Sequence, residues 1–225
     1  MAGTFDAVIF DCDGVLVDSE ILAIEVELAL LADEGLDYEL ADFKARFLGL
    51  SDRAFCEALD ADCQLRLGRA LREDFLDLTH QGRRAAVRSR LQAVTGAAEA
   101  VAAFNGPRAV ASSTGVEFLR MKLELTGLWT LFDPHAYSAD LVPHAKPAPD
   151  IFLHAAREIG VAPGRCLVLE DSANGVLAGR AAGMRVWAFT GGSHCDDATA
   201  EPLLKAGAER VVCSWPDAAD LFRQA

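Results

Sequence analysis

The chain has 225 residues, of which 52% are hydrophobic and 24% are charged. Such a composition is typical of a globular protein and unlike that of a disordered or collagen-like chain. The formal net charge of -13 opposes binding to phosphate backbones and anionic lipid, so we expect neither a nucleic-acid nor a membrane partner. The N-terminal segment lacks the features of a signal peptide, and the six cysteines form no CxxC pair. We therefore expect a cytoplasmic protein with reduced thiols, and a monomer by default.

The first predicted strand is the apolar run AVIF at 7–10, and the second is RAVAS at 108–112. Nearly one hundred residues separate them, which is far more than one crossover helix needs. Most of this segment has the apolar spacing of amphipathic helices. We therefore expect an all-helical cap domain at residues 16–88, with helices at 20–33, near 39–47, at 52–59 and at 64–79.

Four further short apolar runs follow, and stretches with helical patterns again separate them. Strands that alternate with helices indicate a parallel sheet covered by helices on both faces. We therefore predict an α/β fold with a doubly wound, Rossmann-like parallel sheet, formed by residues 1–15 and 89–225. The four runs are AYS at 136–138, CLVLE at 166–170, RVWAF at 185–189 and RVVC at 210–213.

Unusual polar residues follow four of the predicted strands. Open parallel sheets bind ligands beyond the carboxyl ends of their strands, so these residues should meet at one edge. Packing needs alone do not explain why all four lie there. The segments are Asp11-Cys12-Asp13-Gly14, Ser112-Ser113-Thr114-Gly115, Lys146-Pro147 and Glu170-Asp171-Ser172.

The acidic residues among them predict a metal site. Clustered carboxylates repel one another unless a cation stabilises their charged forms. Magnesium prefers oxygen ligands and commonly joins one or two carboxylates to a phosphate. We predict a Mg²⁺ site with the side chains of Asp11 and Asp171 and the backbone carbonyl of Asp13 as ligands, and with Glu170 as an outer-shell partner.

The same edge offers groups that bind a phosphoryl group. Lys146 supplies a positive charge, and Ser112 or its neighbour Ser113 supplies a hydroxyl donor. Physical reasoning from the sequence does not separate the two serines. Among the other polar residues, His194 beside Cys195 lacks two further ligands for zinc, so we expect an ordinary polar loop there.

Four segments, FDCDGVLVDSE, VASSTG, KPAPDIF and VLEDSANGVLAGRAAGM, resemble in this order the motifs of the haloacid dehalogenase superfamily. They are most similar to its β-phosphoglucomutase-like phosphatase branch, in which a helical cap follows the first motif. The resemblance covers roughly two thirds of the chain. It implies that Asp11 is a nucleophile that forms an aspartyl-phosphate, that Asp13 is the general acid and base, and that Ser112 rather than Ser113 binds the phosphoryl group. We expect a Mg²⁺-dependent phosphatase of a small phosphorylated metabolite, a sugar or polyol phosphate.

A phosphosugar mutase similar to β-phosphoglucomutase is the alternative within this branch. Those mutases resemble FLGLSDR at 47–53, but they carry a lysine where this chain has Leu48 and an arginine where it has Asp52. They also carry a histidine in place of Ala23. Arg53 could partly replace the missing arginine, so the alternative stays open.

Three residues of the cap region, Glu20, Arg46 and Arg53, are candidates for contact with the substrate, although the two arginines fit an exposed surface equally well. Functions from other classes remain possible alternatives. A phosphorylation-controlled receiver combines similar residues, but its phosphoacceptor follows the third strand and it has no cap. A binding protein without activity would not need every charged motif. Dehalogenases and phosphonatases lack an aspartate at the position of Asp13, which disfavours both.

Overall fold

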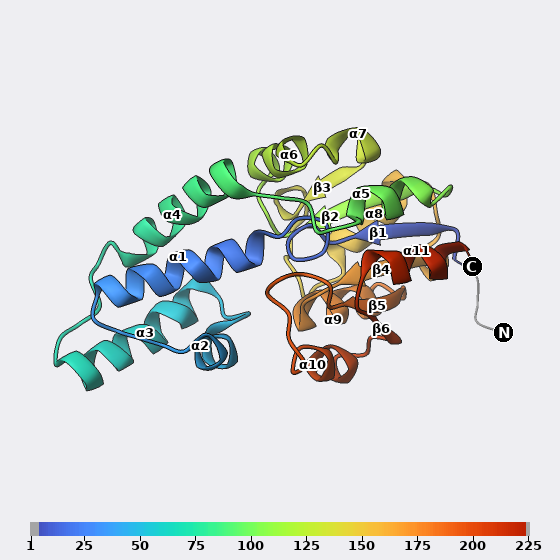
Figure 1. Cartoon of the computed structure of the whole chain (residues 1–225). Helices are drawn as coiled ribbons and strands as arrows, with labels where there is room; N and C mark the ends of the chain where they lie inside the picture. The colour runs from blue at the N-terminus through green and yellow to red at the C-terminus, as the bar shows by residue number, and fades with distance from the viewer. Residues whose placement is uncertain (1–4, 224–225) are drawn as a thin grey trace. The chain divides into compact units, whose positions relative to one another are not determined.

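Figure 1 shows the computed structural model of the protein, which describes residues 5–223. These residues form two compact units. One comprises the residues up to Glu20 and those from Leu91 onward, and the other comprises Ile21–Arg90. The expected cap, residues 16–88, begins five residues before this second unit begins and ends two residues before it ends. Within residues 5–223, no helix combines the length and the apolar character that crossing a membrane requires.

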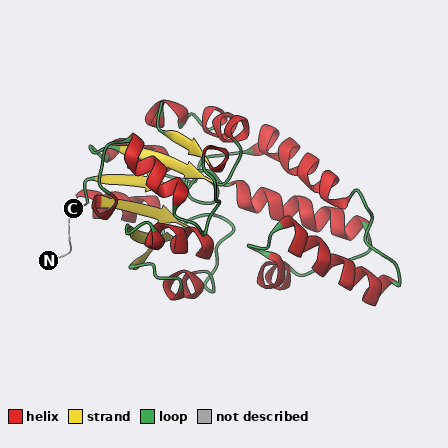
Figure 2. Ribbon diagram, turned by 180° about the vertical axis from the view of Figure 1, so that it is seen from behind, coloured by secondary structure: helices red, strands yellow, loops and turns green. Residues whose placement is uncertain are grey.

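The larger unit contains a six-stranded, fully parallel sheet with the strand order β3-β2-β1-β4-β5-β6. Helices lie on either side of this sheet (Figure 2). The predicted doubly wound α/β fold is therefore confirmed, and all six predicted strands form, the last one residue shorter than expected. The strands are β1 (Ala7–Phe10), β2 (Arg108–Ser112), β3 (Ala136–Ser138), β4 (Cys166–Glu170), β5 (Arg185–Phe189) and β6 (Arg210–Val212).

Alternation along the buried strands divides the core of this unit between the two faces of the sheet. In β1, Val8 and Phe10 pack into one cluster with the side chain of Trp215, whereas Ile9 packs into the other with Phe152. The first cluster is covered by α5 (Ala97–Ala103), α6 (Val116–Leu125), α7 (Trp129–Phe132) and α11 (Trp215–Arg223), and the second by α8 (Asp150–Glu158), α9 (Ala173–Ala181) and α10 (Ala200–Lys205).

Strand register explains why distant motifs converge. Phe10, the last residue of β1, pairs with Val110 of β2 and with Leu169 of β4. The next residue of each strand therefore emerges at the same level of the same edge. Strand order changes direction at β1, which is the position where open α/β sheets form their ligand-binding crevice.

The smaller unit is helical, and aromatic residues dominate its core. Phe43, Phe47, Phe55 and Phe75 are buried there, with ring centroids 5.2 Å apart for Phe43 and Phe47 and 5.5 Å apart for Phe47 and Phe55. Edge and tilted contacts of this kind add to the burial of the rings. The helices are α2 (Leu40–Phe47), α3 (Asp52–Leu67), α4 (Phe75–Arg90) and most of α1 (Ser19–Asp33).

Two of the four expected helices in this unit have different bounds in the structure. The expected helices at 52–59 and 64–79 are instead α3, which continues to Leu67, and α4, which begins at Phe75. α3 runs on through Asp62, whose carboxylate accepts hydrogen bonds from Tyr38 at 2.5 Å and Arg46 at 2.9 Å. Gly68 ends the helix with a φ of 68°, a conformation that favours glycine.

Candidate active site

The acidic turn after β1 carries the two predicted catalytic aspartates. The backbone N–H of Asp11 still donates to Leu169 of the neighbouring strand at 3.0 Å, whereas Asp13 lies beyond the strand. Gly14 has a φ of 73°, and a Cβ atom at this position would lie 1.8 Å from Oδ2 of Asp171. Glycine therefore allows both the turn and the close approach of the Asp171 carboxylate.

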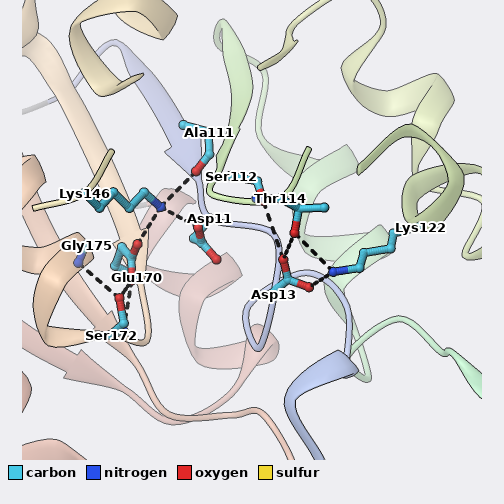
Figure 3. Close-up of polar contacts among 10 residues, drawn as sticks. All are labelled: Asp11, Asp13, Ala111, Ser112, Thr114, Lys122, Lys146, Glu170, Ser172 and Gly175. Carbon is cyan, nitrogen blue, oxygen red and sulfur yellow. Dashed lines mark hydrogen bonds and ion pairs between the residues drawn. The ribbon is translucent and has the colours of Figure 1, made fainter. Parts of the chain in front are cut away.

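Lys146 joins the ends of three strands (Figure 3). Its ammonium group donates to Oδ1 of Asp11 at 2.5 Å, to Oε1 of Glu170 at 2.7 Å and to the carbonyl oxygen of Ala111 at 3.0 Å. The side chains of Lys146 and Glu170 are almost completely buried. Burial lowers the pKa of Lys146, but the charges of Asp11 and Glu170 outweigh this effect and raise it. Lys146 is therefore a fixed positive charge beside Asp11.

The other oxygen of Glu170 is held by the start of the next helix. Oε2 accepts hydrogen bonds from the backbone N–H and the hydroxyl of Ser172, both at 2.9 Å. Ser172 is also the N-cap of α9, and its hydroxyl accepts from the N–H of Gly175 at 3.0 Å. Because both of its oxygens are bound by protein, Glu170 suits an outer-shell position better than a direct metal ligand.

A second buried lysine, Lys122 of α6, forms an ion pair with Asp13. Its ammonium group donates to Oδ1 of Asp13, while Oδ2 accepts from Thr114 at 2.7 Å and from Ser112 at 3.5 Å (Figure 3). The hydroxyl of Ser19 also donates to Oδ1. Burial raises the pKa of Asp13, but the charge of Lys122 and these hydrogen bonds outweigh it and hold the pKa below its usual value. The two aspartates of one turn therefore pair with different lysines.

Sequence reasoning missed Lys122, although the sequence contains a signal for it. Lys122 lies three residues after Leu119 and one before Leu123, and all three side chains are buried. The spacing places the lysine within the apolar stripe of α6 rather than on the solvent face. A lysine in such a stripe requires a buried acidic partner, which here is Asp13.

The two serines that follow β2 lie in different surroundings. Ser112 is buried, its hydroxyl reaches Asp13, and it accepts from the backbone N–H of Thr114 at 3.0 Å. Ser113 is exposed. Ser112 is thus the serine that the structure brings to the catalytic turn, together with Thr114, to which the sequence analysis gave no separate role.

Asp171 pairs with His194 of the loop after β5. Nε2 of His194 lies 3.1 Å from Oδ2 of Asp171, and both side chains are almost completely buried. Burial lowers the pKa of His194, but hydrogen bonds with Asp171 and Cys195 outweigh it and raise the pKa to about 10. The expected polar loop is indeed a loop, but its histidine is buried against a predicted metal ligand.

Of the three predicted substrate contacts, Glu20 lies in the unit that carries the catalytic turn. Burial and the charges of Asp13 and Asp171 raise the pKa of Glu20 to about 7. The two arginines belong to the other unit. Arg46 pairs with Asp62 at 2.8 Å, and Arg53, which is 87% exposed, pairs with Glu57 at 2.7 Å. A role for these residues in substrate binding stays a prediction.

The charges at this edge suit a divalent cation. Burial raises the pKa of Asp11, and the charges of Glu170, Asp171 and Asp13 add to this effect against that of Lys146. Within residues 5–223, no group of three acidic, histidine or cysteine side chains is arranged to coordinate a metal ion by itself. Magnesium needs only one or two carboxylates, because it keeps several waters. The raised pKa values of Asp11, Asp171 and Glu20 show that carboxylates are crowded here, and a bound cation would favour their charged forms.

The close contact between Gly14 and Asp171 places the predicted carboxylate ligand against the turn that carries the carbonyl of Asp13. Hard oxygen atoms of Asp11, Asp13 and Asp171 form a donor set that fits magnesium and not a soft metal. The residues present therefore fit the expected ion.

Comparisons with known proteins identify the family of this chain. A family model described as haloacid dehalogenase-like hydrolase matches residues 5–183. The phosphorylated carbohydrates phosphatase of Thermotoga maritima is 31% identical over 215 residues, 92% of this chain and 94% of that protein. Hexitol phosphatase B of Escherichia coli K12 is 32% identical over 187 residues, 80% of this chain and 81% of that protein. A crystal structure of a HAD family hydrolase from Deinococcus radiodurans, with bound phosphate and sodium, has a TM-score of 0.84 and 35% identity, covering 97% of this chain and 96% of that one.

Proposed function

The chain belongs to the haloacid dehalogenase-like hydrolases and is a phosphatase, and on that premise we propose that it is a Mg²⁺-dependent phosphatase of sugar or polyol phosphates that works through an aspartyl-phosphate at Asp11. One observation carries this proposal. Asp11 and Asp13 lie on the same turn, yet each is paired with its own buried lysine. Two carboxylates in separate charge environments can divide nucleophilic attack and proton transfer between them.

In the first step, a carboxylate oxygen of Asp11 attacks phosphorus while the bond from phosphorus to the substrate oxygen breaks. Asp13 is ionised before substrate binds, because its pKa is held below the usual value, so it must first take up a proton, such as that of the phosphate-ester monoanion, and it then gives this proton to the departing alkoxide. Lys146 and the hydroxyl of Ser112 stabilise charge on the phosphoryl oxygens. Mg²⁺, held by Asp11, Asp171 and the carbonyl of Asp13, supplies further charge neutralisation there when bound.

In the second step, water attacks phosphorus and the bond between phosphorus and Asp11 breaks. Asp13, now ionised, accepts the proton of this water. Hydrogen bonds from Lys122, Ser19 and Thr114 hold the ionised carboxylate in one orientation between the two steps. The free carboxylate of Asp11 and inorganic phosphate are the products of this step.

The proposed function is tested by a screen of phosphorylated sugars, polyols and a generic aryl phosphate that measures released phosphate. We expect hydrolysis of at least one sugar or polyol phosphate with Mg²⁺, complete loss of activity with excess EDTA, and recovery when Mg²⁺ is added back. The names of the relatives support this substrate class. Failure to hydrolyse any compound, the aryl phosphate included, would contradict the proposal.

The same screen separates a phosphatase from a mutase. With β-glucose 1-phosphate and a bisphosphate primer, we expect free phosphate and little glucose 6-phosphate. The reason is that Leu48 and Asp52 replace the two cationic residues with which the resembling mutases hold a second phosphate. Efficient isomerisation would reverse the assignment.

We also propose, as the sequence predicts, that the protein is cytoplasmic.

A further inference from the structure

The loop between β5 and α10, residues 190–199, packs onto the acidic edge of the sheet, although it belongs to none of the four motifs. The backbone N–H of Ser193 donates to Oδ1 of Asp18 at 2.9 Å, and its hydroxyl donates to Oδ2. A Cβ atom at Gly192 would lie 2.6 Å from the carbonyl oxygen of Gly14. The loop is therefore fixed to the turn that carries the two catalytic aspartates.

Within this loop, His194 and Gly14 enclose the carboxylate of Asp171. Oδ2 of Asp171 accepts a hydrogen bond from Nε2 of His194 at 3.1 Å. A Cβ atom at Gly14 would lie 1.8 Å from this oxygen and 2.6 Å from Cε1 of the histidine ring. The histidine is 4% exposed, so it has no solvent-facing function that would explain its presence.

We propose that His194 is a positioning residue that holds Asp171 in the orientation required to bind the metal ion. This inference rests on the proposed function, because it concerns the Mg²⁺ of the same site. The hydrogen bond occupies Oδ2 of Asp171 and leaves its other carboxylate oxygen for the cation. Residues that orient a metal ligand in this way are often nearly as important as the ligand, and their loss typically costs about 10- to 100-fold in metal affinity.

A competing reading gives His194 the opposite effect. A protonated histidine on Asp171 would repel a cation and would compete with it for the carboxylate. Removal of the ring should then strengthen metal binding, whereas removal of a positioning residue should weaken it. The two readings therefore predict changes of opposite sign in one measurable quantity, the dissociation constant of the metal.

The test measures the binding of Mn²⁺ to the whole chain in the absence of substrate. Mn²⁺ takes the same oxygen ligands as Mg²⁺. Electron paramagnetic resonance reports the concentration of free Mn²⁺ and therefore the dissociation constant. We expect His194→Leu to raise the dissociation constant by about 10- to 100-fold. His194→Gln keeps a neutral N–H donor of similar reach and should change it by less than about threefold. His80→Leu on α4 is the histidine control: the ring of His80 pairs with Asp52 and not with a predicted metal ligand, so the substitution should have no effect.

Unchanged or tighter binding in His194→Leu would overturn the inference. If the leucine variant does not fold, His194→Asn provides the same discrimination, because its shorter amide cannot reach the position of Nε2 and should also weaken binding. A wild-type protein that hydrolyses phosphate esters but binds no Mn²⁺ or Mg²⁺ would refute the metal requirement and this inference with it. A wild-type protein that binds the ion while all His194 variants bind equally well would refute the inference alone.

Discussion

Asp11→Asn is expected to lower kcat for hydrolysis of an aryl phosphate by at least about 10⁴-fold, because the amide cannot attack phosphorus and no other carboxylate lies in its place. The substitution is isosteric and removes one charge from a crowded acidic cluster. Lys146 retains its contact with Glu170 at 2.7 Å. The thermal midpoint of unfolding should therefore not fall, which separates loss of the nucleophile from loss of the fold.

Asp6→Asn is the matched control for this experiment. Asp6 lies just before β1 and forms an exposed ion pair with Arg165 at 2.5 Å. It lies outside the acidic turn, so its replacement should leave kcat unchanged. Substantial turnover by purified Asp11→Asn, free of contaminating phosphatase, would remove Asp11 from the role of nucleophile.

Lys122→Met is expected to destabilise the protein by about 3–5 kcal/mol, because it leaves the carboxylate of Asp13 buried without its cationic partner. The two side chains are 6% and 19% exposed, so solvent screens this pair only weakly. Urea unfolding, with the midpoint and the slope both fitted, gives the change in free energy.

The double variant Asp13→Asn/Lys122→Met identifies the cause of this loss. It removes both charges, so it should be more stable than Lys122→Met alone. Lys205→Met, at a position where the lysine side chain is 74% exposed, should have almost no effect on stability. Equal stability of Lys122→Met and the wild type, or no recovery in the double variant, would show that Lys122 does not offset the free-energy cost of burying the Asp13 carboxylate.

Much of the fold and of the catalytic edge was predictable from the sequence because both follow from local patterns. Short apolar runs determine the strands, and the carboxyl ends of parallel strands must meet at one edge. Asp11, Ser112, Lys146 and Glu170 each lie at or after a strand end or in an adjoining loop, and the structure brings them together as expected.

The residues that sequence reasoning missed reach the site from outside these strand ends. Lys122 comes from one turn inside a helix, and His194 from a loop after a strand that carries no motif. No local rule places either side chain beside a particular carboxylate, because the contact depends on how the helix and the loop pack against the sheet.

Transient phosphorylation of Asp11 is the central claim of this account, and chemical trapping tests it most directly. Wild-type protein is mixed with substrate and Mg²⁺, quenched in acid within one turnover and treated with borohydride, which reduces an acyl phosphate to an alcohol. Peptide mass analysis then locates the reduced side chain. We predict homoserine at position 11, formed only when substrate is present. Reduction at another residue, or no reduced residue in a protein that turns over substrate, would contradict the account.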